Sequence, residues 1–281
     1  QNYLKDVYDA LVLGTKDYVE KNNFRGVLIG SSGGIDSALT AAIAYDALGK
    51  GRVKTIMMPF DFTADISIED AGLLAKNLGI EHSEISIKEM YESFSLALKE
   101  SFEGMGIDKT EENLQSRCRG VTLMALSNKL GFLVLTTGNK SEAAVGYSTL
   151  YGDTAGGFSV LKDVSKTLVY ELANYRNSLS VVIPKRIIER PPSAELAPDQ
   201  KDTDSLPDYD RLDPIIEMYV EDDKSIQEII NEGFDEKEVR RIVSLIDFNE
   251  YKRRQAPLGI KISDRNFGKD RRYPITNSWK P

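Results

Sequence analysis

The chain has 281 residues, 41% of them hydrophobic, and a formal net charge of −8 at pH 7, which together allow one large core and argue against a general nucleic-acid-binding protein. Its one cysteine, Cys118, excludes an internal disulfide, and its one histidine, His82, excludes zinc sites built on histidine. Because the chain lacks an apolar run of about 18 residues and a basic-then-apolar signal pattern, we expect a cytoplasmic protein without a membrane partner.

Strand and helix patterns alternate through the first half of the chain. After an amphipathic N-terminal helix, the pattern predicts strands at 26–30, 53–58, 82–87 and 132–136, separated by helices at 36–48, 67–78, 88–102 and 111–130. The strands are continuous apolar runs, which is typical of parallel strands buried on both faces. We therefore expect an α/β fold with a doubly wound parallel sheet of about five strands, flanked by helices, with ligands at the carboxyl ends of the strands.

The second half of the chain has a different character. Residues 190–213 are rich in proline and aspartate. This segment is too long to be only a connector in a compact domain, so we expect a mobile loop or lid. C-terminal amphipathic helices are predicted at 214–220, 225–231 and 235–247. Residues 252–272 then carry eight lysines and arginines against two aspartates, which indicates either a solvated or subunit-contact surface or a face toward phosphates.

The sequence Ser-Ser-Gly-Gly-Ile-Asp-Ser, Ser31–Ser37, follows the first predicted strand and opens a helix. Its glycines, hydroxyls and helix N-terminus are suited to binding phosphate. It matches neither the P-loop pattern nor the dinucleotide fingerprint. Asp36 lies inside this loop, where a carboxylate would repel phosphate unless a divalent cation stood between them, so the loop predicts Mg²⁺. The alternative is an ordinary capped helix start with Asp36 near the helix dipole.

Further polar motifs follow other predicted strands and loops. They are Thr-Gly-Asn-Lys-Ser-Glu at 137–142, Tyr-Gly-Asp at 151–153, Lys166, and Arg-Pro-Pro-Ser-Ala-Glu at 190–195. Taken singly, each has a structural explanation: Asn139 as a helix cap, Glu142 as a carboxylate favoured by a helix dipole, and Lys166 as a surface lysine.

Together, these motifs resemble those of one family. The Ser-Gly-Gly-x-Asp-Ser loop is similar to the pyrophosphate loop of the N-type ATP pyrophosphatases, which cleave ATP to AMP and pyrophosphate while activating a substrate oxygen. The later motifs, with Asn-Leu-Gln-Ser-Arg-Cys-Arg at 113–119, resemble NAD synthetase, and most closely the synthetase half of the glutamine-dependent enzymes. The resemblance runs from about Tyr3 to Tyr273. It implies one synthetase domain over residues 1–281 with an adenine nucleotide alpha-hydrolase-like fold.

The resemblance implies ATP-dependent amidation of deamido-NAD to NAD, through an acyl-adenylate that ammonia attacks, with release of AMP and pyrophosphate. It implies that ATP is bound by Ser31, Ser32, Gly33, Gly34, Ser37, Thr137, Lys166 and Ser193. It implies that deamido-NAD is bound by Asn113, Arg117, Glu142 and Lys252. It implies Asp36 and Glu142 as Mg²⁺ ligands, and Asp36, Asp153 and Lys166 as catalytic residues, with Asp153 near the reacting pyridine carboxylate. One departure is Leu150, where many ammonia-dependent members have a lysine.

The source of ammonia and the assembly follow from the same resemblance. We find no sequence pattern of a glutaminase, so we expect either the use of free ammonia or an amidotransferase domain that precedes residue 1 in a longer chain. Because family members pair through the helices after the pyrophosphate loop, the resemblance implies at least a homodimer.

Two other functions stay open at this point. Another N-type ATP pyrophosphatase, of the GMP or argininosuccinate synthetase type, would share the loop. A non-catalytic adenine-nucleotide module of the same fold, as in electron-transfer flavoproteins, would not need Asp36 and Glu142 as a metal pair. Within the motif at 113–119, Cys118 is expected in the core, and Arg117 and Arg119 are two residues apart on a helix, so at most one should face the site.

Overall fold

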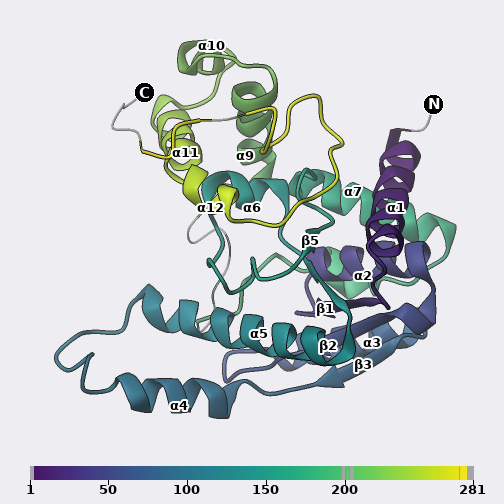
Figure 1. Ribbon diagram of the computed structural model, residues 1–281. Helices are drawn as coiled ribbons and strands as arrows, with labels where there is room; N and C mark the ends of the chain where they lie inside the picture. Colours follow the sequence, from purple (N-terminus) through teal and green to yellow (C-terminus); the bar gives the residue numbers. More distant parts are fainter. Residues whose placement is uncertain (1–2, 198–199, 201, 203–205, 272, 277–281) are drawn as a thin grey trace.

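The computed structural model describes residues 3–197, 200, 202, 206–271 and 273–276. Its centre is a parallel five-stranded sheet in the order β3-β2-β1-β4-β5 (Figure 1). The strands are β1 (Val27–Gly30), β2 (Val53–Met57), β3 (Glu81–Glu84), β4 (Leu133–Thr136) and β5 (Phe158–Ser159). In the register, Val27 pairs with Val53 on one side and with Leu133 on the other. This arrangement confirms the predicted α/β class and parallel sheet.

Successive side chains of β1 point to opposite faces of the sheet, and Val27, Leu28 and Ile29 are all buried. Helices therefore cover both faces. Val27 and Ile29 belong to a core that includes residues of α1 (Tyr3–Lys21), α2 (Ile35–Leu48), α3 (Asp65–Leu78) and α7 (Lys166–Leu179). Leu28 belongs to the core on the other face, beneath α4 (Lys88–Leu98) and α5 (Lys109–Leu130). Cys118 of α5 lies in this second core with 2% of its surface exposed, as predicted.

The C-terminal helices build a third core beyond the sheet. They are α9 (Tyr209–Ile216), the π-helical turn η3 (Glu217–Glu221), α10 (Ile226–Asn231) and α11 (Glu236–Phe248), and they share this core with the short α6 (Lys140–Val145). The last helix, α12 (Glu250–Arg254), follows α11. In Figure 1 this group lies on the opposite side of the molecule from α4 and α5. No helix among the described residues is both long and apolar enough to cross a membrane.

Several elements differ from the sequence-based expectation. The predicted loop at 190–213 is too long, because α9 begins at Tyr209 and Pro214 lies inside it rather than at its start. The mobility of this loop stays a prediction, and residues 198–199, 201 and 203–205 lie outside the described residues. No sequence pattern predicted β5, the turn η1 (Lys50–Arg52), α7, α8 (Lys185–Glu189) or α12. β5 has two residues, too few to show a periodic pattern.

Candidate active site

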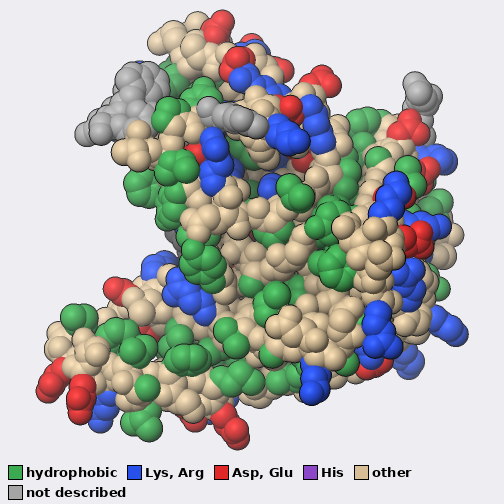
Figure 2. Space-filling model, in the orientation of Figure 1, with side chains coloured by type: hydrophobic (Ala, Val, Ile, Leu, Met, Phe, Trp, Pro, Cys, Tyr) green, Lys and Arg blue, Asp and Glu red, His purple; other side chains and the backbone are tan. Residues whose placement is uncertain are grey.

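Two loops meet at the carboxyl ends of β1 and β4, which are neighbours in the sheet. The chain leaves β1 through α2 toward β2 and leaves β4 through α6 toward β5, so the two paths diverge here. Ligands of open α/β sheets bind at such a switch point. A cavity of about 320 Å³ lies here, lined by both loops, α5, α12 and residues 190–196. The surface is indented on the side between α5 and the C-terminal helices (Figure 2).

The predicted phosphate loop forms an open helix N-terminus in this cavity. Ser31, Ser32, Gly34 and Ser37 line the cavity. Gly34 occupies the N-cap of α2 without a side-chain cap, so the first N–H groups of the helix are available to an anion. The Ser37 hydroxyl donates to the Gly34 carbonyl at 3.0 Å and accepts from the Ser32 N–H at 3.3 Å. The loop is therefore preorganised by its own short hydrogen bonds.

Gly33 gives a first testable prediction. Its φ is +74°, and a Cβ there would lie 2.3 Å from the Ser67 carbonyl oxygen. A residue other than glycine costs about 1–2 kcal/mol in this conformation, and the clash adds to that cost. Gly33→Ala should therefore shift the loop and weaken ATP binding at least about tenfold, measured by titration calorimetry. Gly49→Ala is the matched control, because its φ is +78° but nothing lies within 4 Å of its Cβ position; equal losses in both variants would contradict the role of the Ser67 contact.

Asp36, Glu142 and Lys166, which are far apart in sequence, meet beside this loop. The Lys166 ammonium lies 2.5 Å from Asp36 Oδ2 and 3.6 Å from Glu142 Oε1. Asn139 joins the two carboxylate-bearing helices, since its amide Nδ2 donates to Asp36 at 2.8 Å and its Oδ1 accepts from the Glu142 N–H at 3.0 Å. Asn139 is thus the predicted helix cap and also a contact of Asp36. We call Asp36, Glu142 and Lys166 the carboxylate–lysine cluster.

Burial makes this cluster electrostatically unusual. Desolvation and the nearby Asp36 carboxylate raise the pKa of Glu142 to about 8, against the opposing effect of Lys166. Desolvation alone would lower the pKa of Lys166, but Asp36 and Glu142 outweigh it and raise that pKa above its usual range. Lys166, only 1% exposed, is therefore a fixed buried cation at the edge of the cavity.

The two carboxylates of the cluster fit the oxygen ligands that Mg²⁺ prefers. Mg²⁺ is commonly held by one or two carboxylates together with substrate phosphates and water. Among the described residues, no group of three or more His, Cys, Asp and Glu side chains could hold a metal by itself. Asp36 and Glu142, which both contact Lys166, therefore fit a Mg²⁺ ion whose other ligands are phosphate and water.

Asp153 lies in the cavity wall and packs against α5. The Thr149 N–H donates to both of its carboxylate oxygens at 3.0 Å, and the Ser116 hydroxyl donates to Oδ2 at 3.3 Å. The close approach of α5 requires glycine at 152, because a Cβ there would lie 2.2 Å from Ser116 Oγ. Burial raises the pKa of Asp153 to about 6, although these hydrogen bonds oppose the shift.

Three residues predicted to bind deamido-NAD contact the segment 146–150 in the structure. The Asn113 side chain accepts from the Thr149 hydroxyl at 2.7 Å. The exposed Arg117 donates through Nε to the Leu150 carbonyl at 3.3 Å, and Lys252 donates to the carbonyls of residues 146 and 148 at 2.8 Å. Lys252 lines the cavity, whereas Asn113 and Arg117 are not among its lining residues. Their direct substrate contacts stay predictions; in the structure they clamp the segment that leads to Asp153.

Arg119 is the arginine of α5 that faces the cavity. It lines the cavity, and its Nε donates to the Met58 carbonyl at 3.0 Å. Burial lowers the pKa of Arg119 to about 10, so it stays charged near pH 7. The two-residue spacing predicted that at most one arginine would face the site, but the sequence pattern could not show which one.

Residues 190–196 lie beside the phosphate loop, and Ser193 lines the cavity, while its contact with ATP stays a prediction. The Arg190 guanidinium donates to the Gly33 carbonyl at 3.1 Å and to the Ser67 hydroxyl at 2.9 Å. That hydroxyl donates in turn to Glu195 at 2.6 Å. The sequence motif contained Arg190 and Glu195, but only the structure shows that they anchor this segment to the phosphate loop. Thr137, also predicted to bind ATP, lines the same cavity.

Comparisons with known proteins agree with this geometry. Residues 7–256 match the family described as NAD synthase. The glutamine-dependent NAD(+) synthetase of Acinetobacter baylyi is 55% identical over 99% of this chain and 52% of its own length. The structure of glutamine-dependent NAD+ synthetase from Acinetobacter baumannii in complex with ADP has a TM-score of 0.67 and 51% identity, covering 98% of this chain and 50% of that one.

A shorter neighbour covers the same region. The structure of NMN synthetase from Francisella tularensis has a TM-score of 0.75 and 30% identity, covering 89% of this chain and 95% of that one. The chain thus spans about half the length of the glutamine-dependent relatives that it matches. Because the family match extends over residues 7–256 and the site motifs lie within it, the chain belongs to the NAD synthase family.

Proposed function

We propose that this chain catalyses the ATP-dependent amidation of deamido-NAD to NAD, with release of AMP and pyrophosphate. The observation that carries the proposal is the carboxylate–lysine cluster at the open N-terminus of α2, inside one cavity with Asp153. A non-catalytic nucleotide module has no use for a buried lysine held between two carboxylates.

The residues of the chain suit the first half of this reaction. A carboxylate lacks a leaving group, so its oxygen must first attack the α-phosphorus of ATP, forming the acyl-adenylate as the bond to pyrophosphate breaks. The uncapped N-terminus of α2, together with the serine hydroxyls that line the cavity, suits the departing β,γ-phosphates. Lys166, which is held at the edge of the cavity by its ion pair with Asp36, would stabilise the charge that develops on the α-phosphoryl oxygens. When bound by Asp36 and Glu142, Mg²⁺ supplies further neutralisation of phosphate charge.

Asp153 suits the second half, in which ammonia attacks the acyl carbon and AMP leaves. The attacking nitrogen must lose a proton as the C–N bond forms, and an ionised carboxylate in the cavity wall can accept it. Ser116 and the backbone of Thr149 hold the Asp153 carboxylate in place. The acyl-adenylate would hydrolyse if water reached it. Arg190 holds residues 190–196 against the phosphate loop, and this segment would help to exclude water from the acyl-adenylate.

The raised pKa of Asp153 predicts an acid limit to activity near pH 6. Below about pH 6 this carboxyl is protonated and cannot accept a proton, so kcat/KM for ammonia, corrected for the free-base concentration, should fall with decreasing pH. Asp153→Asn should be slow at every pH and should lack this limb. A limb that persists unchanged in Asp153→Asn would contradict the assignment.

The same pKa shift has a consequence for stability. Between about pH 4 and pH 6 the folded state keeps a proton on Asp153 that the unfolded chain has lost. The contribution of Asp153 to the free energy of unfolding should therefore decrease as the pH rises from about 4 to about 6. Asp153→Asn should remove that component, which denaturant unfolding at the two pH values can measure.

The function is tested by incubating the chain with ATP, Mg²⁺, ammonium and deamido-NAD and measuring NAD, AMP and pyrophosphate. Equal amounts of the three products are expected. The mononucleotide of nicotinic acid is the most informative alternative substrate, because one similar solved structure is that of an NMN synthetase. XMP with ammonium, and citrulline with aspartate, test the GMP and argininosuccinate synthetase alternatives. AMP release with one of these and none with deamido-NAD would overturn the proposal.

We also propose that in the complete protein ammonia comes from glutamine, through a glutaminase part that the present sequence does not include. The supporting observations are that the relatives are named glutamine-dependent and that this chain spans about half of their length. The chain alone should then use ammonium but not glutamine. A homodimer, expected from the family resemblance, stays a proposal that light scattering can test, and the cytoplasmic location stays a prediction.

A further inference from the structure

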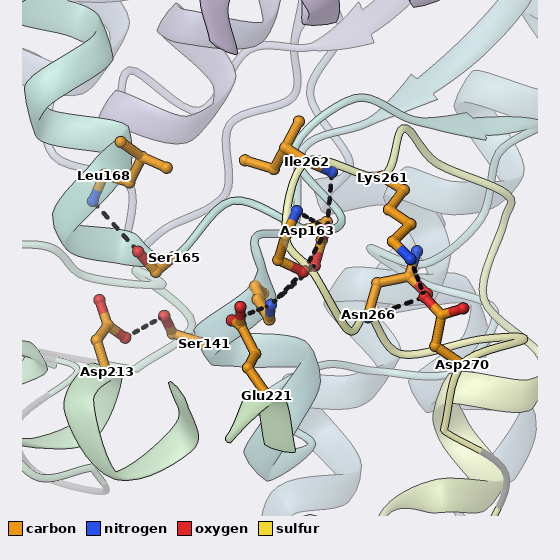
Figure 3. Close-up of polar contacts among 12 residues, drawn as sticks. Ser141, Asp163, Ser165, Leu168, Asp213, Glu221, Lys261, Ile262, Asn266 and Asp270 are labelled. Atoms are coloured by element: carbon orange, nitrogen blue, oxygen red, sulfur yellow. Dashed lines mark hydrogen bonds and ion pairs between the residues drawn. The ribbon is translucent and has the colours of Figure 1, made fainter. Parts of the chain in front are cut away.

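A buried network joins α6, α7 and α9 behind the carboxylate–lysine cluster. At its centre is the Asp213 carboxylate on α9, which accepts from the Ser141 hydroxyl. It also accepts from the N–H and the hydroxyl of Thr167 at 2.8 and 2.9 Å. The Ser141 oxygen accepts in turn from the Lys166 backbone N–H at 2.9 Å. Figure 3 shows the Ser141 and Asp213 side chains pointing toward each other.

The network touches the residues next to the two cluster members on α6 and α7. Ser141 immediately precedes Glu142, and Thr167 immediately follows Lys166. Ser141 is fully buried and Asp213 is 7% exposed, so the donors of this network have little water to replace a lost partner. A buried carboxylate is costly unless it is hydrogen-bonded, and Asp213 meets that need with donors from both helices. One side chain thus fixes the short helix α6 and the first turn of α7 relative to each other.

The network lies on the far side of α6 from the substrate cavity. Asn139 and Glu142 line the first cavity, whereas Lys140 and Ser141 line a second cavity of about 500 Å³ together with Asp213. Asp213 is not among the lining residues of the first cavity. It therefore acts on the reaction only through the residues that it holds.

We propose that Asp213 is a positioning residue for the amidation reaction, which sets the placement of the Lys166 ammonium against Glu142. This inference rests on the proposed function. The Lys166 ammonium is 3.6 Å from Glu142 Oε1, and its backbone N–H is anchored through Ser141 to Asp213. A misplacement of about 1 Å at a catalytic group can cost about 10²-fold in rate. Loss of Asp213 should therefore lower kcat although the residue never contacts substrate.

The first test compares Asp213→Asn with a matched control. The amide has nearly the shape of the carboxylate but only one oxygen. It therefore cannot accept the hydrogen bonds of both Ser141 and Thr167 as the two carboxylate oxygens do. We expect kcat to fall about 10- to 100-fold, with KM for ATP and for deamido-NAD changed less than about threefold. Asp46→Asn is the control, because Asp46 also joins two helices, through Arg176 at 2.6 Å, away from the cavity. It should lower the melting temperature and leave kcat within about twofold of the wild type.

A second test separates positioning from general destabilisation. If Asp213 acts through Lys166, then Asp213→Asn should lower kcat little further in a Lys166→Met background, so the two effects should not multiply. Fully multiplicative effects, or a normal kcat in Asp213→Asn when the wild type is active, would overturn the inference.

A third measurement does not depend on turnover. Hydrogen exchange at the amides of Lys166 and Thr167 should be faster in Asp213→Asn and unchanged in Asp46→Asn, because those amides lose their anchored acceptors only in the first variant. If the wild type makes no NAD, the proposed function fails and the catalytic part of the inference fails with it. Unchanged exchange at both amides would overturn the positioning role itself.

Discussion

Replacing Lys166 by methionine is expected to lower kcat by about 10²–10³-fold, the loss typical of removing one preorganised group that stabilises charge in a transition state. Its ammonium is 2.5 Å from Asp36, is buried, and lies at the edge of the cavity beside the phosphate loop. Methionine has a similar length but no charge. Single-turnover measurement of AMP formation should locate the loss in the adenylation step, since that step develops the phosphoryl charge.

Lys162→Met is the control for this experiment. Lys162 also lines the cavity, but its ammonium donates to the Pro257 carbonyl at 2.5 Å. Its loss should cost less than about tenfold in kcat. Comparable losses in the two variants would mean that the cavity needs positive charge in general rather than the Lys166 ammonium. Thermal unfolding of both variants shows whether either effect reflects loss of the fold, because removing one member of a buried ion pair also destabilises.

Asp36→Asn is expected to weaken the apparent affinity for Mg²⁺ at least about tenfold and to lower kcat at saturating ATP. The carboxylate accepts from Lys166 at 2.5 Å and from Asn139 at 2.8 Å, and it is half of the oxygen pair that suits Mg²⁺. The amide keeps the size of the side chain but removes the charge. The measurement is kcat as a function of free Mg²⁺, together with calorimetric binding of ATP with and without the metal.

Asp46→Asn again provides the control, since Asp46 lies on the same helix α2 and pairs with Arg176. It should leave the Mg²⁺ dependence unchanged. If Asp36→Asn also leaves that dependence unchanged, Asp36 has no role as a metal ligand, although it could still orient Lys166.

The sheet and the gathering of the loops at 31–37 and 137–142 at one edge could be predicted from local patterns, whereas the pairing of Asp36 with Glu142 came from the family resemblance. Apolar runs identify buried parallel strands, and polar motifs directly after those runs must gather at one edge of the sheet. Asn139 and Glu142 even carry their own local signal, a capping box that the structure contains. The proximity of Lys166 came only from the family resemblance, because the helix that begins at this residue was not predicted from the sequence.

Contacts that depend on the packing of distant elements could not be predicted. Which of Arg117 and Arg119 faces the cavity depends on the rotation of α5 against the sheet. Lys252 donates to backbone carbonyls more than a hundred residues away, and backbone acceptors leave no residue-type signal in a sequence. Asp213 was placed at the end of a loop, because its partners on α6 and α7 are known only once three helices are packed together.

The clamp on residues 146–150 has an evolutionary consequence. Its hydrogen bonds run to α5 and α12, whereas those of the carboxylate–lysine cluster run among α2, α6 and α7. The part of the site that would activate a carboxylate with ATP and the part that would recognise the rest of the dinucleotide substrate are thus supported by different helices. Mutations in α5 or α12 can reshape the second part while the first is inherited intact. A family built this way can diversify its substrates without reinventing its use of ATP.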